Sequence, residues 1–213
     1  MKREKEKTCL SPKPAAYGLK LKATRGFTLI ELMVSIAIFV IITAVIVISQ
    51  NRFGGSIMVT NLAYDVALSV RQAQVYGMSV KQSPVACTAG AVTSKFQCSY
   101  GVYFGPSDHY ILFADLNGTG YDTSNDNGTN CTGPECLDVY QITKGNYISD
   151  FCIDNSCKSN SGINHLDIVF HRPNPEPALN GQNSGVASIT VTSPQGISKT
   201  VLISSAAGEI SVR

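Results

Sequence analysis

A long apolar segment near the N-terminus constrains this chain more than any other feature of its sequence. Residues 27–48 are 22 positions with a single charged side chain, Glu31. Because a helix rises about 1.5 Å per residue, a segment of this length spans the roughly 30 Å hydrocarbon layer of a bilayer. The sequence therefore predicts one membrane-spanning helix, at residues 27–48.

The charge distribution orients that helix. Residues 1–26 carry eight Lys and Arg against two Glu, a net charge of +6, and the whole chain carries +2, which leaves −4 for residues 27–213. Since cations are retained on the cytoplasmic side of a membrane, we expect everything after residue 48 to be exported. The acidic exported part offers no bulk positive charge for binding nucleic acid.

Two simpler interpretations of the apolar segment are a cleaved secretory signal and a plain signal anchor. A secretory signal has an apolar region of about 7–15 residues that ends in small residues. The segment here is longer, and Gln50, Asn51 and Arg52 follow it closely. A plain anchor gives no reason for Glu31, because a carboxylate near the end of a membrane helix costs about 1–3 kcal/mol. We therefore expect the Glu31 carboxylate to have a partner that neutralises its charge.

The residues at the start of the apolar segment resemble the processing signal of type IV prepilins. Positions 25–34 are Arg-Gly-Phe-Thr-Leu-Ile-Glu-Leu-Met-Val. In that family an inner-membrane aspartyl peptidase cleaves between the Gly and the Phe and methylates the new amino group. The resemblance implies a cut between Gly26 and Phe27, an N-methylated Phe27, and Glu31 as the fifth residue of the mature chain. Glu31 would neutralise the amine of a neighbouring subunit.

A second helical pattern follows the apolar segment. Leu62, Val66, Val70 and Ala73 recur at spacings of three or four residues, which is typical of an amphipathic helix. We expect this half to continue the membrane helix, to pack its apolar stripe on a sheet, and to end near Gly77.

Beyond this helix the apolar pattern changes to the period of two that strands show. The expected strands are 99–104, 110–116, 139–144, 166–171, 187–192, 200–204 and 209–212, and segments 172–185 and 193–196 have turn composition. One long helix followed by strands predicts an α+β, pilin-like fold in which the helix packs on an antiparallel β-sheet head. The expected domains are a cleaved basic leader (1–26), a transmembrane and assembly helix (27–50), its amphipathic second half (51–82), and an exported β-rich globular head (83–213).

Six of the seven cysteines follow the apolar segment, on one side of the expected membrane. An even set in an exported domain indicates disulfides, and six cysteines allow about 15 pairings. A four-thiolate zinc site at the last four cysteines is the alternative. We favour three local disulfides, Cys87–Cys98, Cys131–Cys136 and Cys152–Cys157.

One loop has oxygen-bearing residues at the spacing of a calcium-binding loop. Asp115, Asn117, Thr119, the Tyr121 carbonyl and Asp126 take positions one, three, five, seven and twelve. The same Asn-Gly and Asp-Asn-Gly sequences are ordinary turn residues, and no second helix follows. Apart from this calcium possibility, we expect no cofactor.

No residue pattern indicates an enzyme. His109, His165 and His171 have neither metal-ligand nor catalytic-triad spacing, and no nucleophile-elbow, zinc-protease or phosphate-loop motif is present. We therefore assign no catalytic residue.

The second half of the chain resembles the GspH/FimT-type minor pseudopilins. The resemblance rests on the helix with Ser-Val-Arg-Gln-Ala-Gln at 69–74, on the strands after it, and on Gly208-Glu209-Ile210 in the closing hairpin. It implies a low-copy subunit at or near the tip of a type II secretion pseudopilus or a type IV pilus. The implied partners are the prepilin peptidase, other pilin or pseudopilin subunits, and the bacterial inner membrane.

Two other functions stay open. One is a FimT-like minor pilin that captures DNA for uptake, although Lys199 and Arg213 are the only cations after residue 172. The other is a surface adhesin anchored by a pilin-like helix, with residues 87–157 as its variable part.

Overall fold

The computed structural model describes residues 26–88, 93–106, 108–125, 131–160 and 162–213, without the side chains of residues 51, 52 and 125. The leader up to residue 25 lies outside the described residues. The chain divides into two compact units, of which the first ends at Val45 and the second is Ile46–Arg213.

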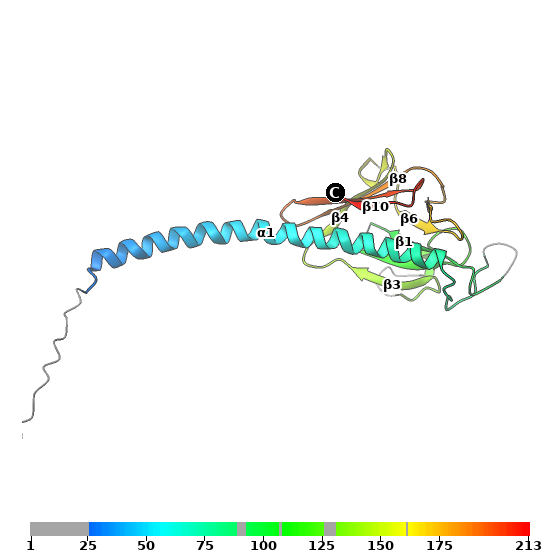
Figure 1. Ribbon diagram of the computed structural model, residues 1–213, viewed down its shortest axis with the longest axis horizontal. Helices are drawn as coiled ribbons and strands as arrows, with labels where there is room; N and C mark the ends of the chain where they lie inside the picture. Colours follow the sequence, from blue (N-terminus) through cyan, green and yellow to red (C-terminus); the bar gives the residue numbers. More distant parts are fainter. Residues whose placement is uncertain (1–25, 89–92, 107, 126–130, 161) are drawn as a thin grey trace, which may run out of the picture. The chain divides into compact units, whose positions relative to one another are not determined.

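A single helix, α1 (Leu29–Met78), accounts for the predicted membrane segment and for its amphipathic continuation (Figure 1). It is 50 residues long and continues through Gly54 and Gly55. Its large apolar side chains from Leu29 to Ile48 are exposed. Among the described residues, α1 is the one helix long and apolar enough to cross a membrane, by the measure of length and composition. The helix ends one residue after Gly77, which confirms the predicted end.

The rest of the second unit forms two antiparallel five-stranded sheets. The first sheet has the order β3-β2-β1-β6-β7, and its strands are β1 (Ser99–Phe104), β2 (His109–Asp115), β3 (Cys136–Gln141), β6 (Leu166–Phe170) and β7 (Pro177–Leu179). The second has the order β10-β9-β8-β4-β5, and its strands are β4 (Tyr147–Ile153), β5 (Ser156–Cys157), β8 (Val186–Thr192), β9 (Ser198–Ser204) and β10 (Ile210–Val212). Short 3-10 helices, η1 (Thr123–Asn125) and η2 (Lys158–Asn160), interrupt the loops. The α+β pilin-like prediction is confirmed, with two sheets in the head.

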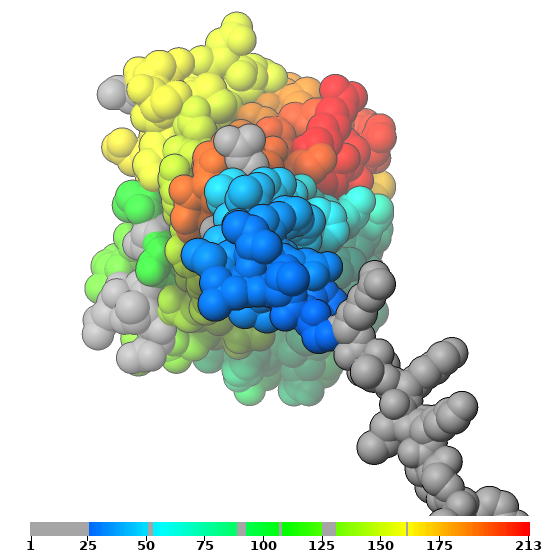
Figure 2. All heavy atoms as spheres, turned by 90° about the vertical axis from the view of Figure 1, so that its left-hand side faces the viewer, coloured from blue at the N-terminus to red at the C-terminus, as the bar shows by residue number. Residues whose placement is uncertain are grey.

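The core lies between the second half of α1 and both sheets. Helix residues spaced by four and three positions are fully buried, and they meet apolar side chains of β1, β2, β6, β8 and β9 in one cluster. These helix residues are Val59, Ala63, Val66, Val70 and Ala73. The C-terminal strand, red in Figure 2, lies beside this half of α1, where Ile210 and Val212 pack against the core. The buried stripe is centred on Ala63 and Val66, so that Leu62, which the sequence placed in it, is only half-buried.

Three strands escaped the sequence analysis, and one was misplaced. In β4 the register shifts between Ile148 and Asp150 in its pairing with β8. This bulge turns Ile148 and Phe151, three positions apart, to the buried side, so β4 lacks the expected period of two. The short β7 lies inside the segment interpreted as a turn, and β5 has two residues. The strand expected at 139–144 is β3, which ends at Gln141 because Lys144 and Gly145 adopt positive φ angles in a turn.

Candidate processing and assembly site

The scissile bond implied by the sequence lies just before α1. Gly26, Phe27 and Thr28 are non-helical, and the helix begins at Leu29. The backbone N–H of Leu32 donates to the Thr28 carbonyl at 3.1 Å, and the Glu31 N–H donates to Thr28 Oγ1 at 3.3 Å. Thr28 is therefore the N-cap of α1, a role for which threonine is well suited because its hydroxyl satisfies one of the unpaired N–H groups of the first turn.

The described part of the chain does not require glycine at position 26. A Cβ atom placed at Gly26 would meet none of the described atoms within 4 Å, its immediate chain neighbours aside. Glycine at position 26 therefore has no packing role among the described residues.

Phe27 and Glu31 are both exposed at this end of α1. The Phe27 side chain is 78% exposed, and Glu31 lies in the first helical turn, where a carboxylate interacts favourably with the helix dipole. Among the described residues no Lys or Arg forms an ion pair with Glu31. The arrangement leaves the carboxylate accessible to a cation from another molecule.

Comparison with known proteins bears on this same region. Residues 21–47 match the family of the prokaryotic N-terminal methylation motif, and the match includes Gly26, Phe27 and Glu31. No curated protein and no solved structure matches the chain. The chain therefore carries a type IV pilin-like prepilin signal on an α+β pilin-like fold. The motif implies processing by a prepilin peptidase, assembly with other pilins, and anchoring in the inner membrane.

Within the head, part of α1 remains uncovered. Tyr64, Leu68 and Val75 are 55%, 65% and 50% exposed, and their spacings of four and seven residues place them on one side of the helix. A groove of about 180 Å³ runs beside them, lined by Tyr64, Ala67, Leu68, Arg71, Ile210 and Val212. We name Tyr64, Leu68 and Val75 the α1 ridge.

The structure contains the three local disulfides that the sequence favours. Cys87–Cys98 is buried, with both residues 2% exposed, and packs with Tyr100 and Ala114. Cys131–Cys136 leads into β3 of the first sheet, and Cys152–Cys157 joins β4 to β5 in the second. The last four cysteines thus form two separate disulfides, one at the start of β3 and one between β4 and β5, and do not form the alternative four-thiolate zinc site.

The loop with calcium-binding spacing is organised by its own hydrogen bonds. Asp115 Oδ1 accepts from the Gly118 N–H at 2.7 Å, and Asn117 Oδ1 accepts from the Thr119 N–H at 3.0 Å and from Thr119 Oγ1 at 2.6 Å. The Tyr121 N–H donates to Asp167 Oδ2 at 3.2 Å. Asp126, the expected last ligand, lies outside the described residues. The described oxygens at positions one and three thus stabilise the turn itself.

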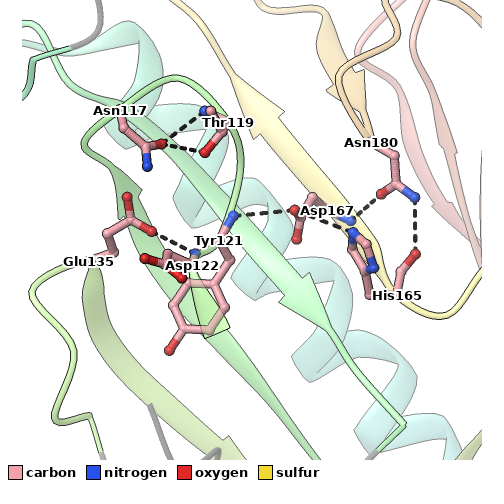
Figure 3. A network of polar contacts seen from close by, with 8 residues as sticks. All are labelled: Asn117, Thr119, Tyr121, Asp122, Glu135, His165, Asp167 and Asn180. Atoms are coloured by element: carbon pink, nitrogen blue, oxygen red, sulfur yellow. Dashed lines mark hydrogen bonds and ion pairs between the residues drawn. The ribbon is translucent and has the colours of Figure 1, made fainter. Parts of the chain in front are cut away.

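Two buried carboxylates that the sequence analysis did not single out hold this loop in place (Figure 3). Glu135 accepts from the Leu116 N–H at 3.1 Å and from the Asp122 N–H at 2.8 Å, and Asp167 accepts from the Tyr121 N–H. Glu135 and Asp167 are each 4% exposed. The sequence could have indicated Asp167, because it is the one charged residue within the apolar strand β6. Glu135 lies in a polar loop, where a carboxylate is ordinary and gives no such indication.

Burial determines the titration of these acids. It raises the pKa of Asp167 to about 7, and the nearby Asp115 and Glu135 carboxylates add to the rise. Burial likewise raises the pKa of Asp115 and of Glu135. The His165 imidazole lies close to this carboxylate, with Nε2 4.0 Å from Asp167 Oδ2. The Asn180 side chain fixes the adjoining backbone by accepting from the Asp167 N–H at 2.7 Å and donating to the His165 carbonyl at 3.0 Å.

The described residues offer little metal-binding geometry. Within them, one group of three His, Cys, Asp or Glu side chains has ligand atoms within 4.8 Å of one another, namely Asp150, Cys152 and Cys157, and its two cysteines form a disulfide. Besides His165, two histidines have described contacts: His171 Nδ1 lies 2.7 Å from Ser99 Oγ, and Nδ1 of the buried His109 lies 3.7 Å from Asp108 Oδ1. Each of these histidines thus contacts a different residue, and the described contacts do not bring them together.

Proposed function

We propose that this protein is a minor pilin or pseudopilin, a structural subunit that is stored in the inner membrane, processed at Gly26–Phe27 and built into a type IV pilus or a type II secretion pseudopilus. One observation carries the proposal: a single helix is apolar and exposed in its first part and packs one face against two sheets in its second. The first part needs a lipid or protein environment, and the second anchors a folded head.

The same apolar surface serves both environments. In the bilayer, the exposed side chains from Leu29 to Ile48 contact lipid. In a filament, the helices of neighbouring subunits replace the lipid. The cationic amine of processed Phe27 then meets Glu31 of a neighbour, which offsets the desolvation of both charges.

The α1 ridge and its groove supply the contact surface of the head. Tyr64 and Leu68 expose large apolar area beside a groove that the C-terminal strand completes. An aromatic and aliphatic anchor next to a groove is the usual composition of a protein–protein contact. The acidic balance of residues 27–213 favours protein partners over DNA. A position at the filament tip, as in the GspH/FimT-type subunits, is the finer form of the proposal.

Orientation completes the proposal: the leader remains in the cytoplasm, and the head with its three disulfides folds in the oxidising space outside. The test is the intact mass and N-terminal sequence of the membrane-extracted protein, from cells with and without a prepilin peptidase. A peptidase-dependent terminus at N-methyl-Phe27 is expected. A terminus at Met1 in both strains, or one beyond Ser49, would contradict the proposal.

Assembly needs its own measurement, because processing alone does not show incorporation. Sheared surface filaments or isolated pseudopili should contain the processed chain at low copy. Replacing Glu31 with Gln should leave cleavage in place and abolish incorporation, since the neighbour's amine would lose its counter-charge. Equal incorporation of the Glu31→Gln variant would remove the pairing from the proposal.

A further inference from the structure

Two acceptors compete for one backbone donor at the start of α1. In a helix the N–H of residue i donates to the carbonyl of residue i−4, so an extension of α1 toward the N-terminus would direct the Glu31 N–H to the Phe27 carbonyl. In the structure this N–H donates to Thr28 Oγ1 instead, at 3.3 Å. The Thr28 hydroxyl thus occupies the donor that helix extension needs first.

The next hydrogen bond in such an extension would involve the scissile bond directly. After Glu31 paired with Phe27, the Ile30 N–H would donate to the Gly26 carbonyl, by the same i to i−4 rule. That carbonyl belongs to the Gly26–Phe27 peptide bond. With Thr28 as N-cap, Gly26 and Phe27 remain non-helical and α1 begins at Leu29.

Hydrolysis requires the Gly26 carbonyl to be free. Water adds to the Gly26 carbonyl carbon, negative charge develops on its oxygen, the C–N bond to Phe27 breaks, and the Phe27 nitrogen takes up a proton. The products are the Gly26 carboxylate and the Phe27 amine. Donors of the peptidase must reach the oxygen as the charge develops, and a helical hydrogen bond from Ile30 would occupy it and bend the backbone away from an extended form.

We propose that Thr28 is a positioning residue for prepilin cleavage: its side-chain cap on Glu31 stops α1 two residues after the scissile bond and keeps the Gly26 carbonyl available to the peptidase. This inference rests on the proposed processing and adds to it the reason for a capping side chain at this position.

The test measures the rate at which the full-length prepilin in detergent micelles is cleaved by a purified prepilin peptidase. Thr28→Val keeps the shape of the side chain and removes the acceptor, whereas Thr28→Ser and Thr28→Asn keep a capping oxygen on different shapes. Loss of an N-cap changes the equilibrium constant between two start positions of a helix by about fivefold. Thr28→Val should therefore be cleaved up to about fivefold more slowly. The Ser and Asn variants should be cleaved at the rate of the unsubstituted chain.

These variants separate capping from direct recognition of the side chain. A peptidase that recognises the shape of residue 28 would accept Val and reject Asn, which is the opposite order and would overturn the proposal. A second readout is the ¹³C chemical shift of the Gly26 carbonyl in the uncleaved prepilin. It should move to a helical value in Thr28→Val and stay unchanged in Thr28→Asn. An unchanged shift in Thr28→Val would also overturn it.

The failure of this inference and the failure of the proposed function give different results. If the unsubstituted prepilin is not cleaved, the proposed processing itself is wrong. If it is cleaved and Thr28→Val is cleaved equally fast, only the role of Thr28 is wrong. Gly26→Val, which places a branched side chain at the scissile bond, serves as the uncleaved control.

Discussion

Gln74 of α1 and Gly208 of the closing hairpin are joined by a buried hydrogen bond, in which Gln74 Nε2 donates to the Gly208 carbonyl at 3.2 Å. The same nitrogen donates to the Pro175 carbonyl at 3.0 Å. One side chain therefore ties the helix to two loops that are more than a hundred residues away. Gly208 adopts a φ of +60°, and a Cβ atom there would lie 2.5 Å from the Pro175 oxygen, so the approach requires glycine.

Removing the amide of Gln74 should destabilise the head. Gln74→Leu keeps the bulk of the side chain and leaves two carbonyl groups without their donor, and we expect a loss of about 2–3 kcal/mol in the free energy of unfolding. Thermal unfolding of the detergent-extracted chain, followed by circular dichroism, measures it. Gln182→Leu is the control, because the Gln182 side chain is exposed. Equal stability of both variants would show that the buried amide contributes nothing.

Stability of the head should fall as pH rises toward neutrality because of Asp167. The folded-state pKa of Asp167, about 7, is above the ordinary value near 3.8, so the folded state binds the proton more tightly than the unfolded state does. This contribution is fully present below pH 4, is lost progressively between pH 4 and pH 7, and is constant above. One pKa unit corresponds to about 1.4 kcal/mol, so the contribution amounts to a few kcal/mol at most.

The matching variant is Asp167→Asn, which is neutral at every pH. Its unfolding free energy should depend less on pH between 4 and 7 than that of the unsubstituted chain. Asp150→Asn on the second sheet is the control, since Asp150 is only half-buried and its carboxylate accepts hydrogen bonds from Ser159. A pH slope that survives in Asp167→Asn would place its origin in Asp115 or Glu135, whose pKa values burial also raises.

Chelation or addition of calcium should leave the head unchanged. The oxygens of Asp115 and Asn117 already accept hydrogen bonds from Gly118 and Thr119, so the turn is formed by the chain itself. Melting temperatures measured with EDTA and with millimolar Ca²⁺ are expected to agree within error. A rise with Ca²⁺ that Asp115→Asn abolishes would instead establish a calcium site in this loop.

Disulfide removal should affect the three bonds unequally. Cys87–Cys98 closes 11 residues and is buried, whereas Cys131–Cys136 and Cys152–Cys157 each close five. On the chain-entropy model, the first bond contributes about 3 kcal/mol and each of the others about 2 kcal/mol. Double Cys→Ala variants, compared by denaturant unfolding, measure the order. A larger loss for Cys131–Cys136 than for Cys87–Cys98 would contradict it.

The sequence predicted those parts of the fold in which local pattern and tertiary packing agree. The first half of α1 was predicted from the length and apolarity of residues 27–48. Its second half was predicted from the spacing of Val66, Val70 and Ala73, because their burial follows the helical period. The strand β4, which lies between β8 and β5, was missed because its bulge breaks the period of two. The loop contacts of Glu135 and Asp167 were also missed, since they join residues 13 to 46 positions apart and no local pattern records such a pairing.

The α1 ridge provides the sharpest test of assembly. Leu68 is 65% exposed and is not part of the buried core, so Leu68→Glu should change the free energy of unfolding of the head by less than about 1 kcal/mol. It places a charge in the expected apolar contact with a neighbouring subunit, where the desolvation of a charged side chain is costly. Incorporation into filaments should therefore fall at least tenfold, while peptidase cleavage continues. Val186→Glu, at an exposed apolar position on the face of β8 opposite the buried Ala187, should assemble normally. If both variants assemble equally well, the ridge is not a subunit contact.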